Sequence, residues 1–291
     1  MIPMLQARQV YTMVIRPAIS YAAHAWHQPD TDKGRGTTPT RKLQKIQNEC
    51  LRVVTGGFKA TPIKSLETLA HVPPLDLYLS SRVAIYTKKA HDSGMDDLIR
   101  KKCSRIQSTL RGPWGCADKE KVGHPCPVRK GWVNEWVGSE QEDGGVNHNA
   151  KKALQGKWEN RWRAATRSAS EAIQQPPDKR VLLLHEGLHK AESSIFTQVR
   201  TGKIGLADFL HGIGVPEAAS PACACGHERE TARHTTVFCP EYRTTRNQLL
   251  INGGLDFKRL LTEKEGVSKL TRWWIRSGRL NQFRLANELI R

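Results

Sequence analysis

A short segment near the C-terminal end, Pro221 to Arg246, places the strongest constraint on how this chain can fold. Within seventeen residues it holds four metal-ligand side chains in the spacing C-x-C-x8-H-x4-C, namely Cys223, Cys225, His234 and Cys239. Thiolates and imidazole are preferred zinc ligands, and four of them close a tetrahedron around the ion. Because metal binding free energy is then folding free energy, a short segment can fold around the ion. The spacing predicts a structural zinc (Zn2+) site.

Two details of this segment leave alternatives open. The usual zinc-binding pair has two residues between its cysteines, whereas one residue separates Cys223 from Cys225. Gly226 follows the pair and lets the backbone wrap a metal closely. His227 competes with His234 for the fourth position, and two buried cysteines beside a surface histidine would give the same composition without a metal. Since protein side chains fill all four positions, we expect a structural site and no catalytic metal.

The charge of the chain favours a polyanionic partner. Its 291 residues include 46 Lys and Arg against 28 Asp and Glu, which is a formal net charge of +18. Such a surplus attracts nucleic acid first and an anionic membrane surface second. No apolar run reaches transmembrane length, and the N-terminus turns polar at once, unlike a signal peptide. With an odd number of cysteines, seven, we expect reduced thiols in an intracellular compartment, nuclear or cytoplasmic.

Apolar residues recur every three to four positions along much of the chain, which predicts a mostly α-helical fold. The clearest segment is Arg41–Val54, and Val181–Arg200 shows the same pattern. The apolar stripe predicted for the first of these is Leu43, Ile46, Cys50 and Val54.

Composition divides the chain into three parts. The stretch from about Lys101 to Gly145 is rich in Gly and Pro and lacks helical periodicity. We therefore predict two helical units, residues 1–111 and 151–291, joined by an irregular linker over residues 112–150. The second unit would carry the zinc-knuckle-like site.

Three blocks of the first unit carry a family resemblance. They are V-Y-T-M-V-I-R-P-A-I-S-Y-A-A-H-A-W (Val10–Trp26), K-L-Q-K-I-Q-N-E-C-L-R-V-V-T-G-G-F-K-A-T-P (Lys42–Pro62) and L-E-T-L-A-H-V-P-P-L-D-L (Leu66–Leu77). In this order they resemble the region after the polymerase palm in reverse transcriptases of fungal non-LTR (LINE-type) retrotransposons. In that family the region acts as a thumb that grips the template–primer duplex.

The resemblance implies phosphate contacts from the basic face of the predicted helix over Arg41–Val54. The residues concerned are Arg41, Lys42, Lys45 and Arg52. A solvated helix face explains the same residues equally well.

The second half is similar to the end of the same polyprotein. The matching blocks are His189–His211, the cysteine segment itself and Trp273–Ala286. The family places a Cys/His knuckle implicated in nucleic-acid binding here, and its ligands match Cys223, Cys225, His234 and Cys239. Around the knuckle we expect RNA or single-stranded DNA to meet basic side chains and, for base stacking, Trp residues or Tyr242. The basic candidates are Arg229, Arg233, Arg243 and Arg246.

Catalytic centres of the family are not recognisable in this sequence. Related elements often carry a ribonuclease H domain between the two blocks, whose chemistry needs about four carboxylates on two metal ions. The segment Gly112–Lys157 is too short for that domain and lacks its opening D-G-S or D-G-T pattern. We expect the polymerase palm to lie upstream of Met1. The resemblance thus implies a non-enzymatic, nucleic-acid-binding fragment without catalytic residues, a membrane partner or a small-molecule substrate; a functionless transposon relic is the alternative.

One motif points to a different chemistry. His185, Glu186 and His189 form a literal H-E-x-x-H, which on a helix would place two zinc ligands beside a general base, as in zinc peptidases. Gly187 weakens the helix, and no third ligand follows at the expected spacing. We therefore expect this segment to pack in the core.

Overall fold

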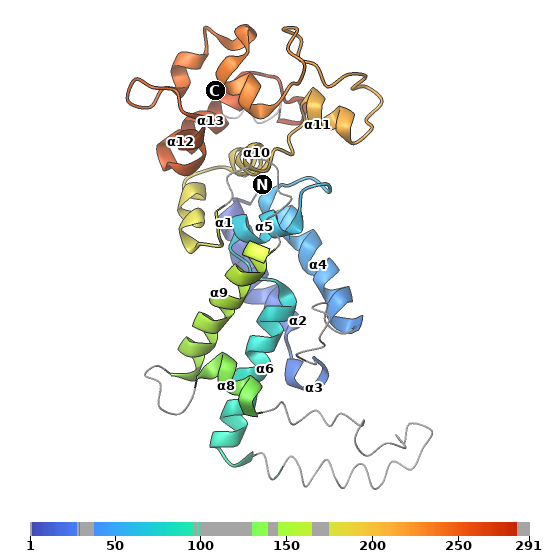
Figure 1. The fold of residues 1–291 in the computed structure, drawn as a ribbon, viewed down its shortest axis with the longest axis vertical. Coiled ribbons are helices and arrows are strands. Elements are labelled where there is room, and N and C mark those ends of the chain that lie inside the picture. Colours follow the sequence, from blue (N-terminus) through green and yellow to red (C-terminus); the bar gives the residue numbers. More distant parts are fainter. Residues whose placement is uncertain are drawn as a thin grey trace. The chain divides into compact units, whose positions relative to one another are not determined.

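The computed structural model describes residues 2–27, 29, 38–95, 98, 130–138, 145–164 and 175–283 (Figure 1). Helices and turns make up this part of the chain, and no strand occurs in it beyond one isolated antiparallel bridge between Ile251 and Gly254. The mostly α-helical fold predicted from apolar spacing is confirmed. None of the described helices is long and apolar enough to cross a membrane.

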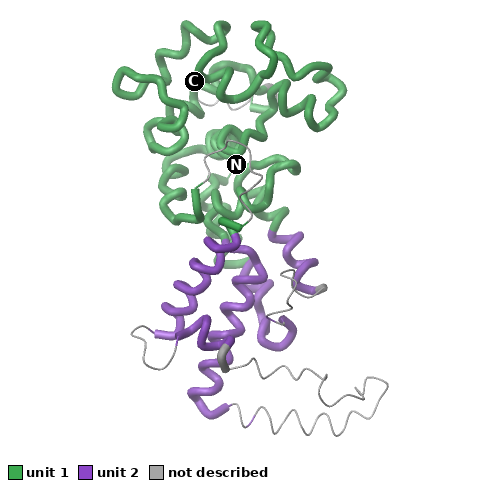
Figure 2. The backbone as a smooth tube through the Cα atoms, viewed as in Figure 1, with its two compact units in different colours: residues 1–15, 48–72, 162–291 green, residues 16–47, 73–161 purple. Residues whose placement is uncertain are grey.

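The described chain forms two compact units that interleave along the sequence (Figure 2). Unit 1 comprises residues 1–15, 48–72 and 162–291, and unit 2 comprises residues 16–47 and 73–161. We predicted two consecutive units instead. Composition marks linkers, but it does not reveal which distant apolar faces pair.

The helices divide between the units as follows. Unit 1 contains α1 (Met4–Val10), α5 (Ile63–Ala70), α10 (Lys190–Thr201), α11 (Ala207–Gly212), α12 (Phe257–Thr262) and α13 (Lys264–Arg276). Unit 2 contains α2 (Arg16–Ile19), α3 (Ala23–Trp26), α6 (Leu75–Asp92) and α8 (Lys130–Val137). Helices α4 (Thr38–Thr55) and α9 (Val146–Ala164) contribute residues to both. Single turns of π-helix lie at Tyr11–Ile15 and His234–Phe238, and 3-10 turns at Lys179–His185, Pro240–Tyr242, Arg246–Leu249 and Asn281–Phe283.

Helix α6 organises unit 2, packing against α3 and α8. Val133, Trp136 and Val137 of α8 join the apolar cluster that contains Leu77 and Ala84 of α6. The prediction of an irregular linker over residues 112–150 is therefore wrong for α8 and for the start of α9. The helical spacing of the α8 residues creates one apolar face, which the Gly and Pro content around it obscured. Residues 101–129 and 139–144 of the predicted linker lie outside the described residues.

Helix α4 packs through three of the four residues of the predicted stripe, since Val54 is buried and Leu43 and Cys50 are partly buried. Leu51 and Val54 are buried in the unit 1 cluster, whereas Ile46 of the predicted stripe is 49% exposed. In unit 2, the fully buried Gln47 donates from Nε2 to the carbonyl oxygen of Pro73, at 3.1 Å. A buried polar side chain with a satisfied hydrogen bond replaces an apolar one here, which a purely hydrophobic stripe could not anticipate.

Helix α10 runs through the core of unit 1, and its residues from Ala191 to Thr201 are all buried. Ile195, Phe196 and Val199 pack in one cluster with Trp273 and Trp274 of α13. The cysteine segment lies in the chain between α10 and α13, the two helices of this contact.

The helix predicted over Val181–Arg200 is interrupted. A 3-10 turn ends at His185, Gly187 adopts a left-handed backbone with φ of +78°, and α10 begins only at Lys190. The Glu192 carboxylate accepts a hydrogen bond from the backbone N–H of His189 at 2.7 Å, which starts the new helix. His185 and His189 therefore do not share one helix face.

Candidate metal centre

Four side chains of the cysteine segment converge in unit 1. The Sγ atoms of Cys223, Cys225 and Cys239 and a ring nitrogen of His234 all lie within 4.8 Å of one another. Cys223 Sγ is 3.7 Å from Cys239 Sγ, and Cys225 Sγ is 3.3 Å from His234 Nε2. In a tetrahedral zinc site these separations are about 3.8 Å between two sulfurs and about 3.6 Å between sulfur and nitrogen. The predicted ligand set can hold a metal ion with little rearrangement.

A tight turn presents the first two thiols. The backbone N–H of Gly226 donates to the carbonyl oxygen of Cys223 at 2.9 Å, and Gly226 has φ of +90°. The N–H of Cys223 in turn donates to the carbonyl oxygen of His227 at 2.8 Å. Only a glycine adopts this backbone without strain, so Gly226 has the role expected from its place after the pair.

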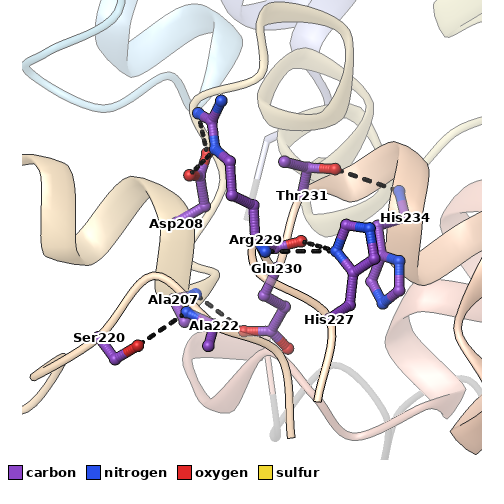
Figure 3. Close-up of polar contacts among 9 residues, drawn as sticks. All are labelled: Ala207, Asp208, Ser220, Ala222, His227, Arg229, Glu230, Thr231 and His234. Carbon is purple, nitrogen blue, oxygen red and sulfur yellow. Dashed lines mark hydrogen bonds and ion pairs between the residues drawn. The ribbon is translucent and has the colours of Figure 1, made fainter. Parts of the chain in front are cut away.

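A single π-helical turn, His234–Phe238, presents the other two ligands. Its wide hydrogen bond runs from the N–H of Cys239 to the carbonyl oxygen of His234, at 2.8 Å. The Thr231 hydroxyl accepts a hydrogen bond from the N–H of His234 at 3.1 Å and so starts the turn (Figure 3). Because a π-turn places residues five apart beside each other, it brings Cys239 next to His234.

The two candidate histidines take different positions. His234 is buried and faces the thiols, whereas His227 is exposed and stacks on the His234 ring with centroids 4.0 Å apart (Figure 3). The Nδ1 atom of His227 accepts a hydrogen bond from the backbone N–H of Arg229 at 3.2 Å. The geometry thus brings His234 into the ligand group and leaves His227 as a ring packed against it.

Burial and local hydrogen bonds set the proton affinity of the ligands. Burial raises the pKa of the Cys223 thiol to about 12 and also raises that of Cys239. A hydrogen bond from the His227 backbone lowers the pKa of Cys225, and burial lowers that of His234. A bound divalent cation would stabilise the thiolate form of the cysteines and lower their pKa, because its positive charge is the largest in such a site.

A buried carboxylate anchors the segment between the ligands. Glu230 is 2% exposed and accepts two hydrogen bonds from the Arg279 guanidinium, at 2.6 and 2.7 Å. The same carboxylate accepts the backbone N–H of Ala207 at 2.8 Å, at the start of α11 (Figure 3). In the sequence Glu230 is marked only as an acidic residue among basic ones, which does not reveal this role.

The predicted nucleic-acid contacts around the knuckle differ in availability. Arg229 is paired with Asp208, at 2.6 and 3.1 Å (Figure 3), and Arg246 donates to the carbonyl oxygens of Thr236 and Cys239. These two guanidinium groups hold the loop together. Arg233 and Arg243 are exposed.

The predicted contacts on α4 also fall into two groups. Arg41, Lys42 and Lys45 are exposed. Arg52 is partly buried, pairs with Glu49 at 2.8 Å and donates to the carbonyl oxygen of Lys59 at 3.3 Å.

The H-E-x-x-H residues do not form a metal site within the described part of the chain. His185 is buried, and its ring meets that of Phe196 edge-on with centroids 5.1 Å apart. Glu186 pairs with Lys264 at 2.9 Å. Of these residues only His185 packs in the core as expected, because the helix is interrupted at Gly187 and Glu186 and His189 are exposed.

Comparisons of the chain with protein-family models, curated proteins and solved structures found no match. The function is therefore inferred from the chemistry of the four converging ligands and from the charge of the chain.

Proposed function

We propose that this protein binds nucleic acid, RNA or single-stranded DNA, through a segment folded around a structural zinc ion. The observation that carries the proposal is the convergence of three thiols and one imidazole within 4.8 Å, in a chain of net charge +18. A closed metal site organises the loop, and the surplus of Lys and Arg supplies the attraction for phosphates.

The ligand chemistry favours zinc over other ions. Thiolate sulfur is a soft ligand that disfavours Mg²⁺ and Ca²⁺, and three thiolates with one imidazole match a common structural zinc set. All four positions are filled by Cys223, Cys225, His234 and Cys239, which leaves no open position for a substrate. The zinc ion would stabilise the loop and take no part in catalysis. Because free thiolates must stay reduced, we place the protein in the nucleus or cytoplasm.

The family resemblance suggests a wider context. We interpret the chain as a C-terminal part of a retrotransposon reverse transcriptase polyprotein, with the polymerase and ribonuclease H centres elsewhere. Its own role would be to hold RNA or single-stranded DNA by phosphate contacts.

A salt titration tests the proposal. We expect the full chain to bind a fluorescein-labelled single-stranded oligonucleotide, with log K falling linearly in log salt at about −0.7 per phosphate contact. The slope should correspond to several phosphate contacts. Weak binding without salt dependence would contradict the proposal and favour a functionless transposon relic.

A further inference from the structure

A groove of about 1220 Å³ opens in unit 1 beside the metal centre. Its walls are the end of α10 with the turn into α11, the segment from Arg229 to Phe238, and α12 with the residues before it. The proposed function does not use this groove, although one of its walls lies between two metal ligands.

Three cations on the groove wall lack a carboxylate partner among the described residues, namely Lys203, Arg233 and Lys258.

The three acidic residues of the groove are already occupied. Asp208 pairs with Arg229, and Glu230 pairs with Arg279. Asp256 accepts the backbone N–H of Lys258 at 2.8 Å, where it caps the start of α12. Five cations line the groove against these three carboxylates, so the charge that the groove offers to a ligand is positive.

Arg200 adds a fixed positive charge to the inner wall. It is only 5% exposed, and its guanidinium donates to two neutral acceptors, the carbonyl oxygen of Leu261 at 3.2 Å and Oε1 of Gln175 at 2.8 Å. Burial lowers its pKa to about 10, so it remains charged at neutral pH. A buried cation with neutral partners is costly, and an anion in the adjacent groove would offset that cost.

Aromatic rings lie beside these cations. Phe238 is 61% exposed, and the Arg233 guanidinium lies 5.9 Å from its ring centre. Also in the groove lining, the Lys203 ammonium lies 5.6 Å from the ring centre of Phe209, which is buried. An exposed aromatic ring beside a cation suits a nucleobase above the ring with a phosphate at its side.

Phe238 lies in the chain between two of the candidate metal ligands. This residue ends the π-turn that begins at the ligand His234, and the ligand Cys239 follows it directly. An ion held by both ligands would therefore restrain the backbone on either side of Phe238, whose side chain is exposed. Tyr242, expected from the sequence to stack with bases, instead packs edge-on against Trp273 with centroids 5.4 Å apart.

We infer that this groove is the site that takes a single strand of nucleic acid, with a base stacked on Phe238 and phosphates on Lys203, Arg233 and Lys258. The inference rests on the proposed function and specifies where it operates. A duplex would not use Phe238, because its bases are already stacked on one another.

The test compares variants of the full chain in anisotropy titrations with oligo(U), oligo(dT) and a duplex. Phe238→Ala should weaken binding of the single strands about 5- to 150-fold, as expected for the loss of one stacked base, and leave duplex binding unchanged. Phe238→Tyr should restore the affinity. Lys203→Ala with Lys258→Ala should reduce the salt slope by about 1.4, which is two phosphate contacts on a single strand.

The matched control is Lys179→Ala with Arg276→Ala, two exposed cations outside the groove. It should change the slope for the single strands less than the groove pair does. Circular dichroism and zinc content must match the parent in every variant. Which of oligo(U) and oligo(dT) depends more strongly on Phe238 distinguishes RNA from DNA as the strand that is bound.

Two results would overturn the inference, and only one of them would also overturn the proposed function. Salt-dependent binding that Phe238→Ala and the groove pair leave unchanged would refute the groove alone and keep the proposed function. The absence of salt-dependent binding in the parent would remove both.

Discussion

The Glu230 carboxylate is buried against the Arg279 guanidinium, with both of its oxygens in hydrogen bonds of 2.6 and 2.7 Å. This pair joins the loop between the metal ligands to the segment after α13, residues that lie far apart in the sequence. Hydrogen bonding to the carboxylate also raises the pKa of Arg279, which means that the charged pair is favoured.

Removing one partner of this pair should destabilise unit 1. Arg279→Ala leaves Glu230 buried without its counter-ion, and we expect a loss of about 1–3 kcal/mol in the free energy of unfolding. The range is lower than for a fully buried pair because the Arg279 side chain is 42% exposed and water screens it. Urea unfolding followed by circular dichroism measures the change. Arg180→Ala, which breaks an exposed pair with Asp178, is the control and should leave the midpoint unchanged.

The metal centre should be lost when two thiols are replaced. The purified full chain should contain one zinc ion per molecule, whereas the Cys225→Ser, Cys239→Ser double variant should contain none and lose helical signal. Elemental analysis with circular dichroism provides both readouts. A parent chain without zinc would contradict the assignment, and zinc retained by the variant would mean that other residues hold it.

Acid should destabilise the fold through His185. Burial, with the nearby charges of Arg200 and Lys190, lowers the pKa of His185 to about 3 from the ordinary value of about 6.5. As the pH falls, His185 is protonated in the unfolded chain near pH 6.5 but in the folded chain only near pH 3. The free energy of unfolding is therefore unaffected by His185 above about pH 6.5. It falls by about 1.4 kcal/mol per pH unit as the pH falls towards 3.

His185→Leu removes this titrating group, so the stability of the variant should fall less steeply with falling pH. The measurement is the unfolding midpoint between pH 6 and pH 4, which lie between the two pKa values of His185. His27 of unit 2 titrates in a similar window, with a pKa lowered by burial to about 4, and is unchanged in the variant. Identical pH profiles for variant and parent would show that His185 is not buried neutral.

A close backbone approach should make Gly56 intolerant of a side chain. Gly56 ends α4 with φ of +72°, and an added Cβ would lie 2.0 Å from Oγ of Ser194 and 2.5 Å from its Cβ. Gly56→Ala should cost about 2–4 kcal/mol, since left-handed strain and overpacking add.

Gly202→Ala separates the two effects, because Gly202 also has a positive φ, +66°, but open space around the added Cβ. We expect this control to cost about 1 kcal/mol. Equal losses in the two variants, measured by urea unfolding, would mean that the contact with Ser194 is unimportant.

Local chemistry was readable in the sequence. The helical class follows from apolar spacing. The ligands Cys223, Cys225, His234 and Cys239 were identifiable because they lie close together in the chain, where a metal site closes within a few turns. Gly187 was recognised as a weak point, since a glycine weakens a helix wherever it occurs, but the helix predicted over Val181–Arg200 ran through it.

Tertiary structure decided the rest. Gln47 is buried because a distant carbonyl oxygen, that of Pro73, accepts its hydrogen bond, so the buried residues of α4 are not confined to its apolar stripe. Glu230 anchors its loop because Arg279, distant in sequence, lies beside it in the fold. Phe238 is an exposed ring at the end of the π-turn. A sequence specifies which groups seek partners, but a buried charge or an exposed ring depends on which distant groups the packed helices bring within contact distance.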